Sequence, residues 1–185
     1  MIYLVDHEDS FTFNLAHILG EFDNVVVSNY YEIDKQKIAK AKTIVLSPGP
    51  GEPKDYPITT KIYNQFKGRK KILGVCLGFQ QILYAEGGKI IQQNKIFHGY
   101  QSIVSILPSS KLFKNMKHLS VGRYHSLKLK EPFHSNTLKI TMRCNMTKVA
   151  MALEDNTNNI FGFQFHPDSF LTKNGKFLIQ KILSA

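Results

Sequence analysis

A cysteine between two glycines is the first feature of this sequence that suggests covalent chemistry. Cys76 lies in the stretch GVCLGFQ, Gly74 to Gln80, where an apolar run stops and a helical pattern starts. A sharp turn from a strand into a helix needs small residues on both sides of its apex, as in a nucleophile elbow with cysteine in place of serine. The thiol would sit at a helix N-terminus, whose dipole favours the thiolate, and the N–H of Leu77 would point toward a developing oxyanion. The alternative is a small buried cysteine that fills space.

A thiol nucleophile needs a base that is near it in space. His166 has the most informative context among the seven histidines. The stretch FGFQFHPDS alternates like a strand as far as His166, and Pro167 then prevents regular continuation. Asp168 follows two residues after the histidine and could orient its imidazole. These residues predict a triad of Cys76, His166 and Asp168. The alternative is a turn histidine beside an ordinary surface acid.

The stretch SPGPGEP, Ser47 to Pro53, follows a strand-like run directly and is stiffened by proline. Such a loop can hold backbone N–H groups in a fixed direction, and Gly51 has no side chain to block a substrate. We expect the N–H of Gly51 to form an oxyanion hole with that of Leu77. The loop lacks the Gly-Lys-Ser/Thr ending of a phosphate-binding loop. A simple Pro-Gly turn is the alternative.

The elements that must position these residues indicate an α/β fold. In the N-terminal half, short apolar runs alternate with helical patterns, which predicts a mostly parallel central sheet flanked by helices on both faces. The expected strands there are Ile2–Val5, Val25–Val27, Thr43–Leu46 and the run KILGVC, with helices in the segments between them. Asp9 or Ser10 is expected to cap the first helix.

The C-terminal half has a different pattern. The runs QSIVSIL, HLSVGRYHSL, LKITMRC, VAMALED and IFGFQFHP are strand-like, with few helical segments between them. This pattern predicts an antiparallel β extension. The chain closes with a short amphipathic helix in NGKFLIQKIL, with Asn174 as the expected cap.

Size and composition are those of one globular domain, which we expect to span residues 1–185. Hydrophobic residues make up 43% of the chain and charged residues 21%, as in ordinary globular proteins. No apolar run is long enough to span a bilayer, and the start MIYLVDHEDS does not resemble a signal peptide. We therefore expect a cytoplasmic protein without a membrane partner, with Cys76 and Cys144 as free thiols.

The formal charge of +10 raises the question of a nucleic-acid partner. The lysines are scattered in several short clusters, and no nucleic-acid-binding motif accompanies them. We interpret them as solvated faces and expect no nucleic acid to bind. The alternative is a surface that docks an acidic protein.

SPGPGEP, GVCLGFQ and FGFQFHPDS, in this order, resemble the motifs of class I (triad) glutamine amidotransferases. DHEDSFTFNL, GGKI, HGYQS and RYHSL add a resemblance to the glutamine-hydrolysing subunit of anthranilate synthase and aminodeoxychorismate synthase. The resemblance covers essentially the whole chain. It implies that Cys76 attacks the carboxamide of L-glutamine, that His166 moves the protons and that Asp168 orients His166. It also implies a set of substrate-binding residues: Gly49, Pro50, Gly51, Gln80 and the backbone of Ser126 and Leu127. No metal and no organic cofactor is needed, because the thiol and the imidazole do the covalent and proton-transfer work.

The resemblance further implies a larger, chorismate-binding synthase subunit, in a heterodimer or heterotetramer, that receives the ammonia. Asp9 and Ser10 are expected to lie near the contact with it. Anthranilate synthesis, in tryptophan biosynthesis, is the first choice, and aminodeoxychorismate synthesis, in folate biosynthesis, is the alternative. The stretch DSFTFNL argues against the guanylate and carbamoyl-phosphate complexes. A non-catalytic regulatory partner with the same fold is the alternative from another functional class.

Two positions depart from the pattern of the family. Phe79 replaces the usual histidine of GxCLGHQ, and a difference in packing or in partner contact is expected there. Asp168 replaces the usual glutamate and is one methylene shorter. Either the backbone shifts to compensate or the bond to His166 is weakened.

Overall fold

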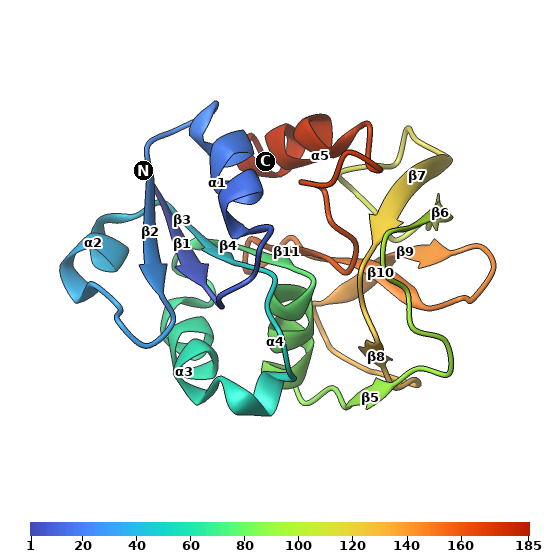
Figure 1. Cartoon of the computed structure of the whole chain (residues 1–185), viewed down its shortest axis with the longest axis horizontal. Helices are drawn as coiled ribbons and strands as arrows, with labels where there is room; N and C mark the ends of the chain where they lie inside the picture. The colour runs from blue at the N-terminus through green and yellow to red at the C-terminus, as the bar shows by residue number, and fades with distance from the viewer.

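A nine-stranded mixed sheet forms the centre of the molecule, in a computed structural model that describes residues 1–185 (Figure 1). Its strands follow the order β2-β1-β3-β4-β11-β10-β9-β6-β7. The first five are parallel to one another: β2 (Val25–Asn29), β1 (Ile2–Asp6), β3 (Thr43–Leu46), β4 (Lys71–Val75) and β11 (Ile160–Phe163). Every residue of β1, β3, β4 and β11 is buried, as expected for strands covered on both faces.

Helices cover both faces of the parallel half (Figure 1). On one face, α1 (Thr12–Gly20) and α5 (Gly175–Leu183) contribute Leu15, Leu19, Leu178 and Ile179 to one hydrophobic cluster. On the other, α2 (Lys35–Lys40), α3 (Pro57–Phe66) and α4 (Leu77–Ala85) contribute to a second cluster. A 3-10 turn, η1 (Pro53–Asp55), precedes α3. None of these helices has the length and apolar character needed to cross a lipid bilayer.

The remaining strands of the large sheet form its antiparallel half: β10 (Ala150–Asp155), β9 (Lys139–Cys144), β6 (Tyr100–Ile106) and β7 (His118–Arg123). A separate two-stranded sheet joins β5 (Ile90–Gln92) to β8 (Leu127–Leu129). The predicted fold class is therefore confirmed: a largely parallel sheet flanked by helices, with an antiparallel extension in the C-terminal half.

The predicted helix caps were wrong in detail. The first helix begins at Thr12, and its cap position is Phe11, not Asp9 or Ser10. The carboxylate of Asp9 accepts the N–H of Phe11 at 2.8 Å and so stabilises the turn before the helix. Asn174 does occupy the cap position of α5, but its side chain makes no capping hydrogen bond.

The carboxyl ends of four neighbouring parallel strands lie at one edge of the sheet. β1 leads into His7, β3 into Ser47, β4 into Cys76, and β11 ends three residues before His166. The register aligns these ends, with Leu46 opposite Gly74 and Val75 opposite Phe163. Open α/β sheets bind their ligands at this edge, and the predicted reactive residues gather there.

Candidate active site

Cys76 lies at the apex of a sharp turn between β4 and α4. Its backbone has φ 52° and ψ −100°, a strained conformation for a residue with a side chain. A Cβ atom at Gly74 would lie 2.4 Å from the carbonyl carbon of Gly78, and one at Gly78 would lie 2.1 Å from the carbonyl oxygen of Leu46. Both flanking positions therefore require glycine, because the helix starts directly against the strand ends.

The thiol of Cys76 is largely but not completely enclosed, with 7% of the residue exposed. Its backbone N–H donates to the carbonyl of Phe163 at 2.8 Å, which attaches the elbow to the end of β11. The side-chain amide of Gln164 lies 3.9 Å from the sulfur. The cysteine therefore lies at the first turn of α4, where the helix dipole stabilises a thiolate.

His166 is held on both its backbone and its ring. Its N–H donates to the carbonyl of Gly122 at 3.0 Å, and its own carbonyl accepts the hydroxyl of Thr172 at 2.7 Å. The ring packs against Phe11 and Tyr124, with centroid distances of 4.9 and 5.0 Å. These contacts come from distant segments of the chain and leave the imidazole few alternative orientations.

The charge of His166 is set by its neighbours. Burial opposes a charged imidazole, but the adjacent Cys76 sulfur and Asp168 outweigh burial and raise the pKa of His166 to about 10. The structure thus brings together Cys76 and His166, which are 90 residues apart in the sequence, and favours a protonated imidazole beside the sulfur.

Asp168 is buried, so it is not an ordinary surface acid. Its Oδ2 lies 3.6 Å from Nδ1 of His166, which is beyond hydrogen-bond distance. Nδ1 and both carboxylate oxygens are buried without a hydrogen-bond partner. Of the two expected consequences of the shorter side chain, the structure has the weakened contact.

The loop after β3 packs against the elbow. The N–H of Gly78 donates to the carbonyl of Ser47 at 3.2 Å, and a Cβ atom at Gly49 would lie 2.5 Å from the side chains of both His7 and Leu77. Gly51 has φ 72°, which favours glycine. The N–H groups of Gly51 and Leu77 have no acceptor within the chain. Both of the expected oxyanion donors are therefore free.

His7 supports this loop from below and was not expected from the sequence to do so. Its two ring nitrogens contact Ser47 and Thr59, the latter at 2.9 Å. Burial lowers the pKa of His7 to about 4, so the ring is neutral. The hydroxyl of Tyr56 donates to the carbonyl of Pro50 at 2.8 Å and fixes the outer part of the loop.

The residues expected to bind substrate lie in different settings. Pro50 and Gly51 are exposed on the loop, and Gly49 is half-buried. Gln80 is buried, and its amide already donates to Gln164 at 3.0 Å and to the carbonyl of Leu127 at 3.5 Å. The N–H of Ser126 has no acceptor within the chain. Gln80 thus joins the elbow helix to the segment of Ser126 and Leu127.

Three neighbours of the reactive pair were missed from the sequence: Phe11, Tyr124 and Gln164. Gln164 lies two residues before His166 in FGFQFHPDS, and this spacing is its only sequence signal. Phe79, at the position of a usual histidine, is fully buried in the cluster formed with α3 and α4. It serves packing and cannot touch a partner.

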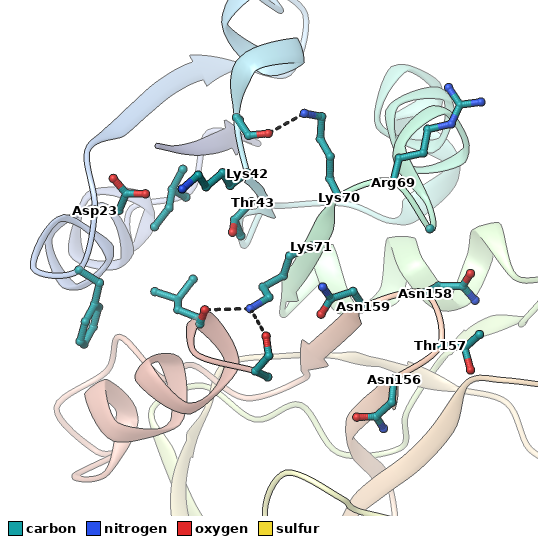
Figure 2. A pocket seen from close by; sticks show the side chains of 16 residues that line it. Asp23, Lys42, Thr43, Arg69, Lys70, Lys71, Asn156, Thr157, Asn158 and Asn159 are labelled. Carbon is teal, nitrogen blue, oxygen red and sulfur yellow. Dashed lines mark hydrogen bonds between the residues drawn. The ribbon is translucent and has the colours of Figure 1, made fainter.

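The largest pocket of the molecule lies at the opposite edge of the sheet and does not contain the reactive pair (Figure 2). Its volume is about 850 Å³, and polar side chains such as Lys42, Arg69 and Asn156 line it. Lys71 is turned onto the carbonyls of Ile182 and Leu183, at 2.7 and 2.8 Å, where it caps the end of α5. This pocket holds no nucleophile, and we place the active site at the elbow.

A family model for class I glutamine amidotransferases matches residues 3–185, nearly the whole chain. The chain belongs to this family. It is a class I glutamine amidotransferase, and the resemblance noted in the sequence is confirmed.

Curated relatives narrow the similarity of this amidotransferase. It is 35% identical to anthranilate synthase component 2 of Lactococcus lactis, over all of this chain and 94% of that protein. It is 32% identical to aminodeoxychorismate/anthranilate synthase component 2 of Bacillus subtilis, over 99% and 95% of the two chains. A match of 37% identity to the bifunctional protein TrpGD of Thermotoga maritima covers 99% of this chain but 32% of that longer protein.

The fold of the amidotransferase is also found in solved structures. A crystal structure of a GMP synthase protein from Thermoplasma acidophilum superposes with a TM-score of 0.85 over 99% of this chain and 92% of that one. Sequence identity in this comparison is 20%, so it supports the fold alone.

Proposed function

We propose that this amidotransferase hydrolyses L-glutamine with Cys76 as the nucleophile and His166 as the acid–base group, and passes the ammonia to a chorismate-aminating synthase partner. The observation that carries the proposal is the strained elbow that holds the Cys76 thiol beside a buried imidazole of raised pKa. The family match supplies the reaction type. All of these parts lie within one domain, residues 1–185.

The first half of the reaction forms a thioester. The sulfur of Cys76 attacks the carboxamide carbon of glutamine, and the thiol proton resides on His166. The C–N bond then breaks, His166 gives its proton to the leaving nitrogen, and ammonia departs. In the second half, water loses a proton to His166 and attacks the thioester, which releases glutamate and restores the thiol. Asp168 orients the imidazole and stabilises its charge. The thiol and imidazole perform every step without a metal or organic cofactor.

The negative charge on the carboxamide oxygen develops next to two free donors, the N–H groups of Gly51 and Leu77. Glutamine itself would lie between the loop residues Gly49, Pro50 and Gly51 and the segment of Ser126 and Leu127. The free N–H of Ser126 is a suitable donor for the carboxylate of an amino acid. Gln80 borders this space through its contact with Leu127.

We assign the ammonia first to anthranilate synthesis, because the Lactococcus relative is an anthranilate synthase component 2. The Bacillus relative is named for both aminodeoxychorismate and anthranilate synthesis, which supports the folate pathway as the second candidate. In either case the partner is a larger chorismate-binding subunit, in a heterodimer or heterotetramer. It would dock near Asp9 and Ser10, which directly precede Phe11 at the imidazole of His166.

Glutamate release by wild-type protein and by Cys76→Ser tests the reaction. We expect slow release from the isolated chain, a faster rate with the synthase partner, and loss of at least about a thousandfold in the variant, because serine at this position lacks the acidity and nucleophilicity of a thiol. Wild-type protein that never hydrolyses glutamine, even with its partner bound, would instead support a purely regulatory role.

Reconstitution with chorismate and each synthase partner in turn tests the pathway. Anthranilate formation from glutamine with only the anthranilate synthase partner supports the tryptophan pathway, and aminodeoxychorismate formation with only the other partner supports the folate pathway. Product from both identifies a shared glutaminase. Failure with both contradicts the proposed partner class.

A further inference from the structure

A fully buried arginine without a carboxylate partner lies next to the proposed glutamine site. Arg123 is at the end of β7, and its guanidinium lies 3.6 Å from the ring centre of Phe97. It donates to the side-chain oxygen of Gln93 at 3.4 Å, to the sulfur of Cys144 at 3.5 Å and to His125 at 3.0 Å. Burial of such a cation is costly, so its contacts need a reason beyond filling space.

The contact with Arg123 determines the tautomer of His125. The Nε–H of the arginine is always a donor, so Nε2 of His125 must be the unprotonated acceptor. Nδ1 then carries the proton and donates to the carbonyl of Leu127 at 2.8 Å. The amide nitrogen of Gln93 lies 3.2 Å from Nδ1, but it donates over the shorter distance of 2.6 Å to the carbonyl of His125. Burial and the cation of Arg123 both disfavour a charged imidazole at this position.

The same segment has its carbonyls engaged. The carbonyl of His125 accepts the side-chain amide of Gln93, and that of Ser126 accepts the backbone N–H of Gln93 at 2.9 Å. The carbonyl of Leu127 receives both His125 and Gln80. With three successive carbonyls turned inward, the N–H of Ser126 is left as a free donor.

We infer that Arg123 and His125 are positioning residues for glutamine binding: the arginine holds His125 in its Nδ1–H tautomer, and His125 holds the backbone of Ser126 and Leu127 in the orientation that receives the substrate. The inference rests on the proposed function, because it assigns glutamine to this backbone. His125 takes no part in the bond-breaking steps, so it affects the affinity for glutamine more than the turnover rate.

Two matched variants of His125, studied in the complex with the synthase partner, test the inference. In His125→Asn the side-chain amide lies near the place of Nδ1 and can still donate to Leu127. In His125→Gln the amide lies near the place of Nε2 and that bond is lost. We expect the asparagine variant to keep KM for glutamine within about threefold of wild type and the glutamine variant to raise it about tenfold, the effect of one hydrogen bond. The value of kcat should change less than about threefold in both.

A readout without turnover uses the alkylation of Cys76 by iodoacetamide and its protection by glutamine. The alkylation rate without glutamine should equal that of wild type in both variants, and the glutamine concentration that gives half-protection should rise about tenfold in His125→Gln only. Equal KM values in the two variants, or a fall in kcat and alkylation rate together, would overturn the inference. A wild type that alkylates normally but neither binds nor hydrolyses glutamine would overturn the proposed function as well.

Discussion

Three buried histidines in this protein have opposite charge preferences, and their neighbours explain why. Burial lowers the pKa values of His7 and His125 to about 4 and about 3, and the cation of Arg123 adds to the effect at His125. His166 faces a sulfur and a carboxylate, which raise its pKa to about 10 in spite of burial. One residue type thus gives two neutral hydrogen-bonding supports and one charged acid–base group.

The gap of 3.6 Å between His166 and Asp168 leads to a prediction at the residue scale. In Asp168→Glu the extra methylene lets the carboxylate reach Nδ1, and we expect kcat for glutamine hydrolysis to rise severalfold. In Asp168→Asn the charge is lost, and kcat should fall at least about tenfold, because the imidazolium loses its counter-ion. Steady-state kinetics of the complex measure both. A glutamate variant slower than the asparagine variant would show that the short side chain is required by the packing.

At the scale of elements, the turn between β4 and α4 depends on how closely the helix meets the strands. Gly74 and Gly78 let the first turn of α4 lie against the end of β3, at the carbonyl of Leu46. This contact forces Cys76 into its positive-φ backbone conformation. The strain at the nucleophile is thus held in place by the packing of helix on sheet.

Substitution of Gly78 tests this packing. A Cβ atom at this position would lie 2.1 Å from backbone, which cannot move without separating α4 from β3. We expect Gly78→Ala to lower the free energy of unfolding by about 3 kcal/mol or more, the range of severe overpacking. Gly20→Ala is the matched control, since Gly20 lies in α1 with no atom within 4 Å of its Cβ position and alanine favours a helix. Denaturant titration compares the two, and equal effects would contradict the explanation.

At the scale of the whole molecule, the parallel half of the sheet brings the reactive groups to one edge, and the segment that leads into β8 closes the site from the side. The opposite edge carries the large polar pocket and the end of α5 (Figure 2). The buried neutral histidines lie on the active-site side, so the stability of the whole fold should respond to their titration.

The sign of this response follows from the lowered pKa values of His7 and His125. Below pH 6.5 the unfolded chain binds protons at these histidines, and the folded protein does not until about pH 4 and pH 3. The free energy of unfolding should therefore fall as the pH falls from about 6.5 to about 5, by up to about 1.4 kcal/mol per pH unit for each histidine. His7→Gln should remove one proton from this slope. His17→Gln, exposed on α1, is the control and should leave the slope as in wild type. Urea denaturation at several pH values measures it, and equal slopes in wild type and His7→Gln would refute the assignment.

The local signals of the sequence were enough to predict the alternation of strands and helices, the elbow at Cys76 and the stiff loop at Gly51. Each of these depends on a few adjacent residues: apolar runs, paired glycines or prolines. The helix caps were less predictable, because Asp9 stabilises the turn before α1 and the helix begins only at Thr12.

Contacts between distant segments were decided by the tertiary structure alone. The sequence by itself determined which residues could react, since a thiol, an imidazole and a carboxylate each stand next to a turn signal. It did not determine that Phe11 and Tyr124 hold the ring of His166, that Asp168 falls short of a hydrogen bond, or that Arg123 selects the tautomer of His125. These features depend on strand register and on side-chain packing at the scale of a single hydrogen bond, and no local pattern of residues carries that information.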